Sequence, residues 1–396
     1  MKVLTFIHSF ETGGVERVAL RLSHAWVRQG VDARLFVGRE EGVLQSDIAA
    51  DVPTYVPQPL RWSSARIETL WMILTLPRHV RDIRPDILFC AGNSYSIVAV
   101  ALRLILGASC PPIVMKVSND LHRSDMPRVG QWFYHRWLRL QRRAFARFVA
   151  MAPPEAIAIA QRFGVSDDCI ATIHDPAVTM EEIDRHASLS PKDENGVRLT
   201  GGARRLVTIA RLTPQKNLAL LIAAFARGAR PADSLTIFGE GPQRAKLERL
   251  IDRLDLRSRV SLAGHVSDPI GRLAEYDLFV SSSDYEGVPA VLIEAMAVGL
   301  PIIATRSSVS IDWMLSSGRH GIVVRCNDAV ALGASLHDPI PPGWSREDAR
   351  RRARRFTIET SAPAYLDLFK ATKRLKPVVP DARDQSIHFT EEAVRT

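Results

Sequence analysis

Short runs of apolar, mostly β-branched residues alternate along most of the chain with longer stretches in which apolar residues recur every three or four positions. This alternation is typical of βα units, in which helices connect parallel strands. In the N-terminal part the runs predict strands at residues 3–8, 33–37, 87–90, 113–117 and 148–151. Residues 14–29 have helical spacing and are followed by Gly30, so they predict a helix that packs on this sheet.

The alternation stops at a polar stretch and then begins again. Residues between Glu181 and Gly202 are mostly polar and include Pro and Gly, which is typical of a linker. From Leu206 onward the runs predict strands at residues 206–210, 235–238, 260–263, 278–281, 301–304 and 321–324. The sequence therefore predicts an α/β protein with two doubly wound domains, residues 1–185 and 203–360. Ser345 and Asp348 predict the start of a basic helix beyond the last strand.

Composition narrows the class of protein. A chain of 396 residues fits two or three domains, and its 46% hydrophobic and 24% charged residues are ordinary for a globular protein. Four scattered cysteines without a Cys-x-x-Cys pair indicate neither a zinc site nor a disulfide framework. The N-terminal apolar run is too short for a signal peptide, and residues 97–110 are too short to span a membrane. We therefore expect a cytoplasmic protein.

The charge balance predicts an anionic partner. Lys and Arg number 52 against 43 Asp and Glu, a net charge of +9. Nucleic acid, lipid headgroups and phosphorylated small molecules all fit this excess, and composition does not distinguish them.

Two glycines, Gly13 and Gly14, lie between the first predicted strand and the first predicted helix. Glycines let a ligand approach the backbone closely, and a helix N-terminus presents amide donors with partial positive charge. This turn therefore fits a phosphate group, although a tight turn without a ligand explains the same two residues.

Arg211 and Lys216 follow the first strand of the second domain. A strand that ends near Arg211 brings its guanidinium to the carboxyl edge of the sheet, where open α/β sheets bind ligands. Lys216 lies at the start of the next helix, so both cations and the helix dipole can converge on one diphosphate. The alternative is a pair of solvated loop charges.

The motif Gly239-Glu240-Gly241-Pro242 follows another predicted strand. It is not a dinucleotide-binding fingerprint, because Arg244 stands where the third glycine is required. Hydride transfer is therefore disfavoured.

Two carboxylates eight residues apart, Glu286 and Glu294, follow the predicted strand at residues 278–281. Glu286 is in a loop, whereas Glu294 is in an apolar helix, where burial is costly without a hydrogen-bond partner. Vicinal hydroxyls of a ribose or another sugar supply two donors. Gly287 and Val288 can offer free amides between the two carboxylates. The alternative for Glu294 is a buried ion pair with an Arg.

These four features occur together in the order and spacing of glycosyltransferase family 4, retaining enzymes of the GT-B fold, which the chain resembles from residue 1 to about residue 375. The resemblance implies two Rossmann-like domains facing across a cleft, with the acceptor against the first and the donor in the second. It also implies a C-terminal helix, residues 361–376, that returns to the first domain. Residues 377–396 are expected to form a flexible tail.

The resemblance also implies roles for the residues of the second domain. Arg211 and Lys216 would hold the diphosphate of a nucleotide-sugar donor and stabilise the leaving group. Glu294 would bind the ribose hydroxyls, and Glu286 would lie beside the transferred sugar. The predicted catalytic residues are therefore Arg211, Lys216 and Glu286, and the amides of Gly287 and Val288 would contact sugar hydroxyls.

In the first domain, Gly13 and Gly14 would close over the donor phosphates. Many members of the family have a His after the strand that corresponds to residues 113–117, whereas this chain has Ser118-Asn119-Asp120. Asn119 or Asp120 is expected to contact the sugar instead. The sequence has no Asp-x-Asp pair. We therefore expect metal-independent transfer without a cofactor, with the nucleoside diphosphate sugar as co-substrate.

Residues 136–147 contain five Arg, together with Trp137 and Phe145, and no acid. A basic amphipathic helix with aromatic residues fits an anionic membrane surface, each cation contributing about 1 kcal/mol near the lipid. The acceptor would then be a lipid-linked saccharide, and the enzyme would be peripheral to the inner face of the cell membrane. The alternative is a solvated helix whose Trp137 and Phe145 face the core.

We therefore expect a retaining glycosyltransferase of surface polysaccharide or lipopolysaccharide synthesis. A sugar-nucleotide epimerase or a phosphorylase of the same fold is the first alternative. A basic nucleic-acid-binding protein is a distant one, because the chain has no recognisable nucleic-acid-binding module. The donor sugar, the base, the acceptor and the linkage stay open.

Overall fold

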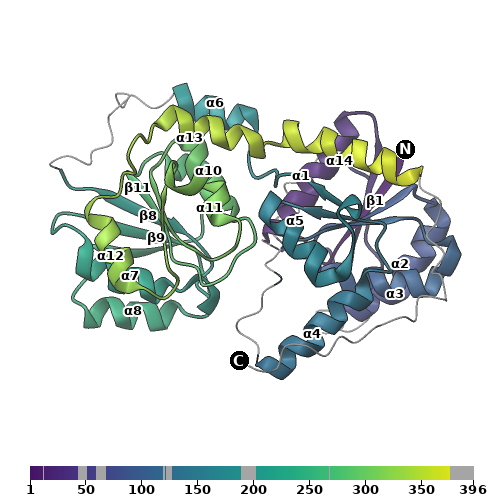
Figure 1. The fold of residues 1–396 in the computed structure, drawn as a ribbon, viewed down its shortest axis with the longest axis horizontal. Coiled ribbons are helices and arrows are strands. Elements are labelled where there is room, and N and C mark those ends of the chain that lie inside the picture. The colour runs from purple at the N-terminus through teal and green to yellow at the C-terminus, as the bar shows by residue number, and fades with distance from the viewer. Residues whose placement is uncertain are drawn as a thin grey trace, which may run out of the picture.

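The computed structural model describes residues 1–11, 13–42, 51–58, 68–118, 121, 127–188, 202–266 and 268–374. They form two parallel β-sheets, which lie side by side in Figure 1 with helices on both faces of each. The predicted α/β architecture is therefore confirmed.

The first sheet has the strand order β3-β2-β1-β4-β5-β6-β7. Its strands are β1 (Lys2–Ile7), β2 (Asp32–Val37), β3 (Thr54–Tyr55), β4 (Ile87–Cys90), β5 (Ile113–Lys116), β6 (Arg147–Ala150) and β7 (Ile170–Thr172). The sequence predicted all of these within one residue except β3 and β7. These two lie at the sheet edges and have two and three residues, too few to show a pattern.

The second sheet has the order β10-β9-β8-β11-β12-β13. Its strands are β8 (Arg205–Ile209), β9 (Ser234–Phe238), β10 (Val260–Gly264), β11 (Leu278–Ser281), β12 (Ile302–Thr305) and β13 (Ile322–Val324). All six predicted strands are confirmed within one residue.

Helices cover both sheets. The N-terminal unit, built on the first sheet, contains α1 (Gly14–Arg28), α2 (Glu68–Ile83), α3 (Ser96–Leu106), α4 (Arg128–Gln141) and α5 (Pro153–Ile159). The C-terminal unit, built on the second sheet, contains α6 (Met180–Ser188), α7 (Leu218–Gly228), α8 (Arg244–Arg253), α9 (Pro269–Leu273), α10 (Ala290–Val298), α11 (Ile311–Met314), α12 (Ala329–His337) and α13 (Arg346–Ala353). Within the described ranges, no helix has both the length and the apolarity that crossing a bilayer requires.

Both sheets reverse their winding direction at the same relative place. The first strand of each unit is central, so the order changes direction between β1 and β4 and between β8 and β11. Loops at the carboxyl ends of such neighbouring strands diverge to opposite faces and leave room for a ligand. The loops that follow these four strands are therefore the expected place for a binding site.

The runs of consecutive apolar residues in the second sheet reflect burial on both faces. Leu278 and Val280 of β11 pack in one core with α7, α8 and α12. Phe279, between them, packs in the other core with α10 and α11. Successive side chains of a strand point to opposite faces, so a strand covered on both sides needs an unbroken apolar run.

The last described helix, α14 (Ile358–Lys373), follows the C-terminal unit in sequence but packs in the core of the N-terminal unit. The buried Trp26 of α1 donates from Nε1 to the carbonyl oxygen of Ala362 at 3.1 Å. Its ring also meets those of Tyr365 and Phe369, with centroid separations of 5.9 and 5.2 Å. Figure 1 shows this helix, in yellow, extending from the C-terminal unit across the N-terminal one.

The chain passes between the units twice, and the two passages are paired. The amide of Ala177 donates to the carbonyl oxygen of Phe356 at 3.1 Å, and that of Ile358 donates to Val178 at 3.0 Å. Ser361 Oγ also donates to the carbonyl oxygen of His174 at 2.7 Å. We call residues 173–178 and 356–358 the junction. The boundary expected at residue 185 lies farther on, within α6, whose Ile183 packs in the C-terminal unit.

The expectation of one basic helix over residues 136–147 is wrong. Helix α4 ends at Gln141, and Arg147 already belongs to β6. The chain must turn here because Phe145 packs in the core against Phe148, with ring centroids 5.6 Å apart. Trp137 is half-buried.

The predicted helix start near Ser345 is confirmed. Ser345 Oγ accepts a hydrogen bond from the amide of Asp348 at 3.1 Å and caps α13. The tail expected at residues 377–396 lies outside the described residues.

Loss of the Trp26 ring should destabilise the N-terminal unit, because Trp26 connects α1 to α14. We expect Trp26→Ala to lower the free energy of unfolding by about 3–5 kcal/mol. Trp26→Phe should cost less, because it keeps most of the packing and loses mainly the hydrogen bond to Ala362, about 1 kcal/mol. Urea denaturation followed by circular dichroism measures both. Leu104→Ala, at a residue that is 78% exposed, is the control; equal losses in all three variants would contradict the assignment.

Candidate functional site

The loops after β8 and β11, the two strands at the switch point of the second sheet, are hydrogen-bonded to each other. The amide of Asp284 donates to the carbonyl oxygen of Gln215 at 2.9 Å. Gln215 Nε2 donates to the carbonyl oxygen of Tyr285 at 2.8 Å, and Ser282 Oγ donates to that of Lys216 at 2.9 Å. Each loop therefore fixes the position of the other.

Asn217 terminates the short turn that carries Lys216. Its φ of 42° is left-handed, a conformation that Asn tolerates better than most residues. Its side chain donates to Asp284 Oδ1 at 2.8 Å and accepts from the amide of Leu220 at 3.4 Å, capping α7. Lys216 is thus held between two loops and a helix start.

The structure brings together Lys216 and Glu286, two of the residues singled out in the sequence. Lys216 Nζ donates to Glu286 Oε1, and both side chains are largely buried. The backbone of Glu286 is held as well, since its amide donates to the carbonyl oxygen of Ser307 at 2.8 Å.

Arg211 lies two residues after the end of β8 and is exposed. Among the described residues, its guanidinium has no hydrogen-bond or ion-pair partner. A guanidinium without a described partner, on the loop that also carries Lys216 at the carboxyl edge of the sheet, is available for an anionic ligand.

Gly287 and Val288 are buried at the end of the same loop. Within the part of the chain that the structure describes, neither amide has an acceptor. A Cβ on Gly287 would lie 2.4 Å from the carbonyl oxygen of Ser118, which follows β5. The glycine therefore allows the C-terminal unit to approach the N-terminal unit beside two free amide donors.

Glu294 lies on α10 and is 3% exposed. The nearest cation is Arg17 of α1, whose Nη1 is 3.6 Å from Glu294 Oε1. Burial raises the pKa of Glu294, whereas Arg17 lowers it. Across the described ranges neither carboxylate oxygen accepts a hydrogen bond. The sequence left open a buried ion pair between Glu294 and an Arg, and the structure contains this pair. The pair leaves both carboxylate oxygens of Glu294 without a described hydrogen bond.

Gly13 is the residue before α1 and has an extended backbone. A Cβ on Gly13 would lie 1.7 Å from Glu16 Oε2, and Glu16 Oε1 accepts a hydrogen bond from the Tyr95 hydroxyl. A Cβ at position 13 would displace only the end of the flexible Glu16 side chain, so the described neighbours do not by themselves require glycine there. At Gly14 a Cβ would meet no atom within 4 Å.

Asn119 and Asp120 lie outside the described residues. Sequence reasoning missed Arg17 and the serines after β12, Ser307 and Ser308, because nothing in a local pattern shows contacts between distant segments. Among the described residues, no group of three His, Cys, Asp or Glu is placed to hold a metal ion.

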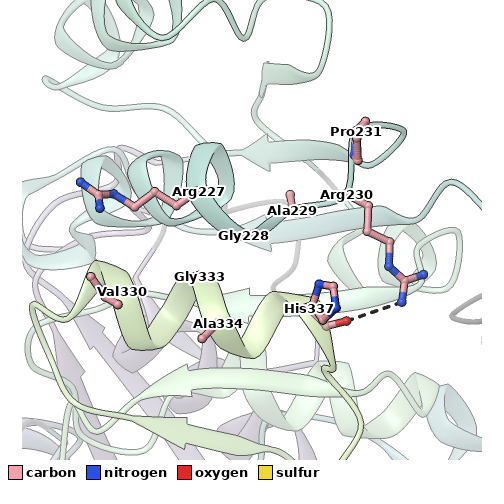
Figure 2. A pocket seen from close by; sticks show the side chains of 9 residues that line it. All are labelled: Arg227, Gly228, Ala229, Arg230, Pro231, Val330, Gly333, Ala334 and His337. Carbon is pink, nitrogen blue, oxygen red and sulfur yellow. Dashed lines mark hydrogen bonds between the residues drawn. The ribbon is translucent and has the colours of Figure 1, made fainter.

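A cavity of about 510 Å³ lies away from these loops. Figure 2 shows that it is lined by the end of α7 and by α12, with Arg227, Arg230 and His337 around it. Helices of βα units run opposite to their strands, so the end of α7 lies at the amino edge of the sheet. The cavity contains none of the predicted site residues.

Two family models match the chain. The description of one is Glycosyltransferase Family 4, over residues 12–178, and that of the other is Glycosyl transferases group 1, over residues 203–338. The chain belongs to glycosyltransferase family 4. It is a glycosyltransferase, and the resemblance predicted from its motifs is confirmed.

Individual proteins agree with this assignment. The lipopolysaccharide core biosynthesis glycosyltransferase LpsD of Rhizobium meliloti is 25% identical over 93% of this chain and 98% of its own. LpsE of the same organism, with the same description, is 30% identical over 41% of this chain and 48% of its own. The structure of Anabaena Alr3699/HepE in complex with UDP and glucose has a TM-score of 0.70 and 17% identity, over 94% of this chain and 100% of that one. The GT-B fold is therefore confirmed.

Gly287→Ala should disturb the contact between the units, because the new Cβ would collide with a backbone oxygen. We expect a loss of glycosyl transfer of 10-fold or more, about the effect of misplacing a reacting group by an ångström. Gly202→Ala is the matched control, since a Cβ there meets nothing within 4 Å. Transfer assays on the full chain measure both; full activity in Gly287→Ala would contradict the close approach.

Proposed function

We propose that this glycosyltransferase moves a sugar from a nucleoside diphosphate sugar to a saccharide acceptor, with retention of anomeric configuration. The observation that carries the proposal is the contact between Lys216 and Glu286 at the switch point of the second sheet, with Arg211 on the same loop as Lys216 and Glu294 on the helix that follows Glu286. The donor would lie mainly against the C-terminal unit and the acceptor against the N-terminal unit.

The diphosphate would be held by the two cations. Arg211 has no partner in the described structure, and Lys216 has further protons to donate beyond its bond to Glu286. Charge-assisted hydrogen bonds from both would strengthen as negative charge grows on the leaving diphosphate. This electrostatic stabilisation would be the main catalytic contribution, without a metal ion or a cofactor.

The two carboxylates would orient the rest of the donor. Glu294 can accept two hydrogen bonds from ribose hydroxyls, which would satisfy a buried carboxylate whose ion pair in the described structure, with Arg17, supplies no hydrogen bond. Glu286 and the free amides of Gly287 and Val288 would bind hydroxyls of the transferred sugar. From the N-terminal unit, Gly13 and Gly14 would approach the phosphates, and Asn119 or Asp120 the sugar.

The proposed reaction needs no dedicated base. The bond between the anomeric carbon and the diphosphate oxygen breaks, and the electron pair leaves with the diphosphate. The acceptor hydroxyl oxygen forms the new bond on the same face of the sugar, and its proton passes to the leaving phosphate oxygen. Atoms and charge therefore balance without a further reactant.

The proposed acceptor is a lipid-linked saccharide of surface polysaccharide or lipopolysaccharide synthesis. The names of LpsD and LpsE support it. No relative reported above is an epimerase, a phosphorylase or a nucleic-acid-binding protein, so nothing favours those alternatives.

Helix α4 offers a surface on which the enzyme would meet the inner face of the cell membrane. Four exposed apolar residues share one helical face: Val129, Trp132, Phe133 and Leu140. Arg136 lies on that face over the Trp132 ring, 5.2 Å from its centroid, and Arg139 and Arg143 are exposed nearby. Apolar and aromatic side chains flanked by Arg are the composition that binds anionic bilayers. This face replaces the helix over residues 136–147 that the sequence predicted.

Lys216→Ala and Glu294→Ala should each weaken donor binding by about 1.5–3 kcal/mol, the effect of losing a hydrogen bond to a charged group. Thermal shift and donor hydrolysis across UDP-, GDP- and ADP-sugars measure the effect and identify the donor. Lys246→Ala removes an exposed cation of α8 and serves as the control. Unchanged donor binding in both site variants, or no stabilisation of the wild-type enzyme by any nucleotide, would contradict the proposed function.

The α4 surface is tested with vesicles. The wild-type enzyme should bind vesicles that contain anionic lipid, and binding should fall as salt is raised. Trp132→Glu together with Leu140→Glu should abolish binding, whereas Val330→Glu, at an exposed residue of α12, should leave it unchanged. Co-sedimentation measures all three; absence of salt-sensitive binding by the wild-type enzyme excludes the membrane contact.

A further inference from the structure

A buried carboxyl group of the N-terminal unit, Glu155, contacts the C-terminal unit and has no place in the mechanism so far. It lies in the first turn of α5 and is 8% exposed. Glu155 Oε2 accepts from the amide of Met151 at 3.0 Å, a local bond within its own unit. Glu155 Oε1 accepts from Ser310 Oγ at 3.1 Å, and Ser310 belongs to the C-terminal unit. The local bond accounts for only one of the two oxygens.

Ser310 is part of a turn that also holds the loop of Glu286 and Gly287. Its amide donates to Ser308 Oγ at 3.3 Å, and Ser308 Oγ in turn donates to the carbonyl oxygen of Gly287 at 2.7 Å. The preceding residue, Ser307, accepts from the amide of Glu286 at 2.8 Å. All three serines are buried. Two backbone groups of the Glu286–Gly287 loop are therefore attached to the turn that Glu155 holds.

Met151 also connects Glu155 to Gly287 through side-chain packing. Met151, whose amide binds Glu155, places its Cε 3.1 Å from where a Cβ on Gly287 would be. Two other charged groups, Lys116 of β5 and Asp175 of the junction, act on Glu155, and they are paired with each other. Because Lys116 and Asp175 pair with each other, the hydrogen bond that Glu155 makes to the C-terminal unit is the one from Ser310, in the turn at residues 307–310.

We propose that Glu155 is a positioning residue, which sets the Glu286–Gly287 loop for sugar transfer from the opposite unit through Ser310 and Ser308. The proposal rests on the proposed function, because it assigns this loop to the transferred sugar. The connection acts directly on the Glu286–Gly287 loop, whereas the segment that carries Arg211 and Lys216 has further supports, the bond from the amide of Leu212 to the carbonyl oxygen of Glu240 at 2.9 Å and the Asn217 cap of α7. Loss of Glu155 should therefore lower kcat much more than it weakens nucleotide binding.

The test compares four single variants of the full-length enzyme. Glu155→Ala removes both hydrogen bonds, and Ser310→Ala removes only the one between units. Glu155→Gln keeps both, because its amide oxygen accepts from Met151 and its amide nitrogen donates to Ser310 Oγ. Ser361→Ala is the matched control, since it deletes another buried serine bond at the junction, to His174, without touching residues 307–310.

Two measurements are made on each variant. Burial raises the pKa of Glu155 to about 7, so kinetics are measured near pH 8.5, where the group is ionised. We expect kcat to fall about 10- to 100-fold in Glu155→Ala and Ser310→Ala, with UDP or GDP affinity nearly unchanged. Glu155→Gln and Ser361→Ala should stay within about threefold of wild type. The double variant Glu155→Ala, Ser310→Ala should be no worse than Glu155→Ala alone.

Hydrogen exchange supplies a readout that does not need turnover. The amides of Asp284 and Glu286, which donate to Gln215 and Ser307, should exchange faster in Glu155→Ala and Ser310→Ala but not in Glu155→Gln or Ser361→Ala. Unchanged exchange and unchanged kcat in Glu155→Ala overturn the positioning role, as does an equal loss of kcat in Ser361→Ala. If the wild-type enzyme turns over no nucleotide sugar, the proposed function is wrong. In that case the hydrogen-exchange result alone tests whether Glu155 positions the loop.

Discussion

The junction, where the two segments that connect the units are hydrogen-bonded to each other, is the constraint on which the rest of the structure depends. Residues 173–178 and 356–358 are joined by backbone hydrogen bonds, and the buried Lys116 and Asp175 form an ion pair that ties the first passage to the end of β5. Removing one partner of such a pair leaves an uncompensated buried charge, which costs about 3–5 kcal/mol. Because α14 then returns to pack on Trp26, the C-terminal unit is anchored at both of its ends.

This junction determines which surfaces meet. Gly287 approaches Ser118, and Arg17 approaches Glu294, so the carboxyl edges of both sheets border the same region. On the C-terminal side the loops are already held by one another before any ligand binds. A site built in this way loses little free energy to reorganisation when charge develops on a leaving group.

The excess positive charge serves several separate purposes. Arg204 is fully buried and paired with Asp233, and Arg352 donates to the carbonyl oxygens of Trp313 and Met314. These cations stabilise the fold rather than bind a partner. Arg211 is exposed without a partner in the described structure, and Arg136 lies on the apolar face of α4. Net charge therefore says less about the ligand than the surroundings of each cation.

The sequence by itself determined the two parallel sheets, eleven of their strands and the positions of the candidate site motifs, because these depend on local periodicity and on residues close together in the chain. It did not determine where α4 ends, since Phe145 turns inward to meet Phe148 from another element. It also did not reveal the contact between Arg17 and Glu294. Nor did it reveal the contact between Glu155 and Ser310, two residues that are 155 positions apart in the chain. Only the tertiary structure decides such contacts, because each joins residues of two different units that the junction holds together.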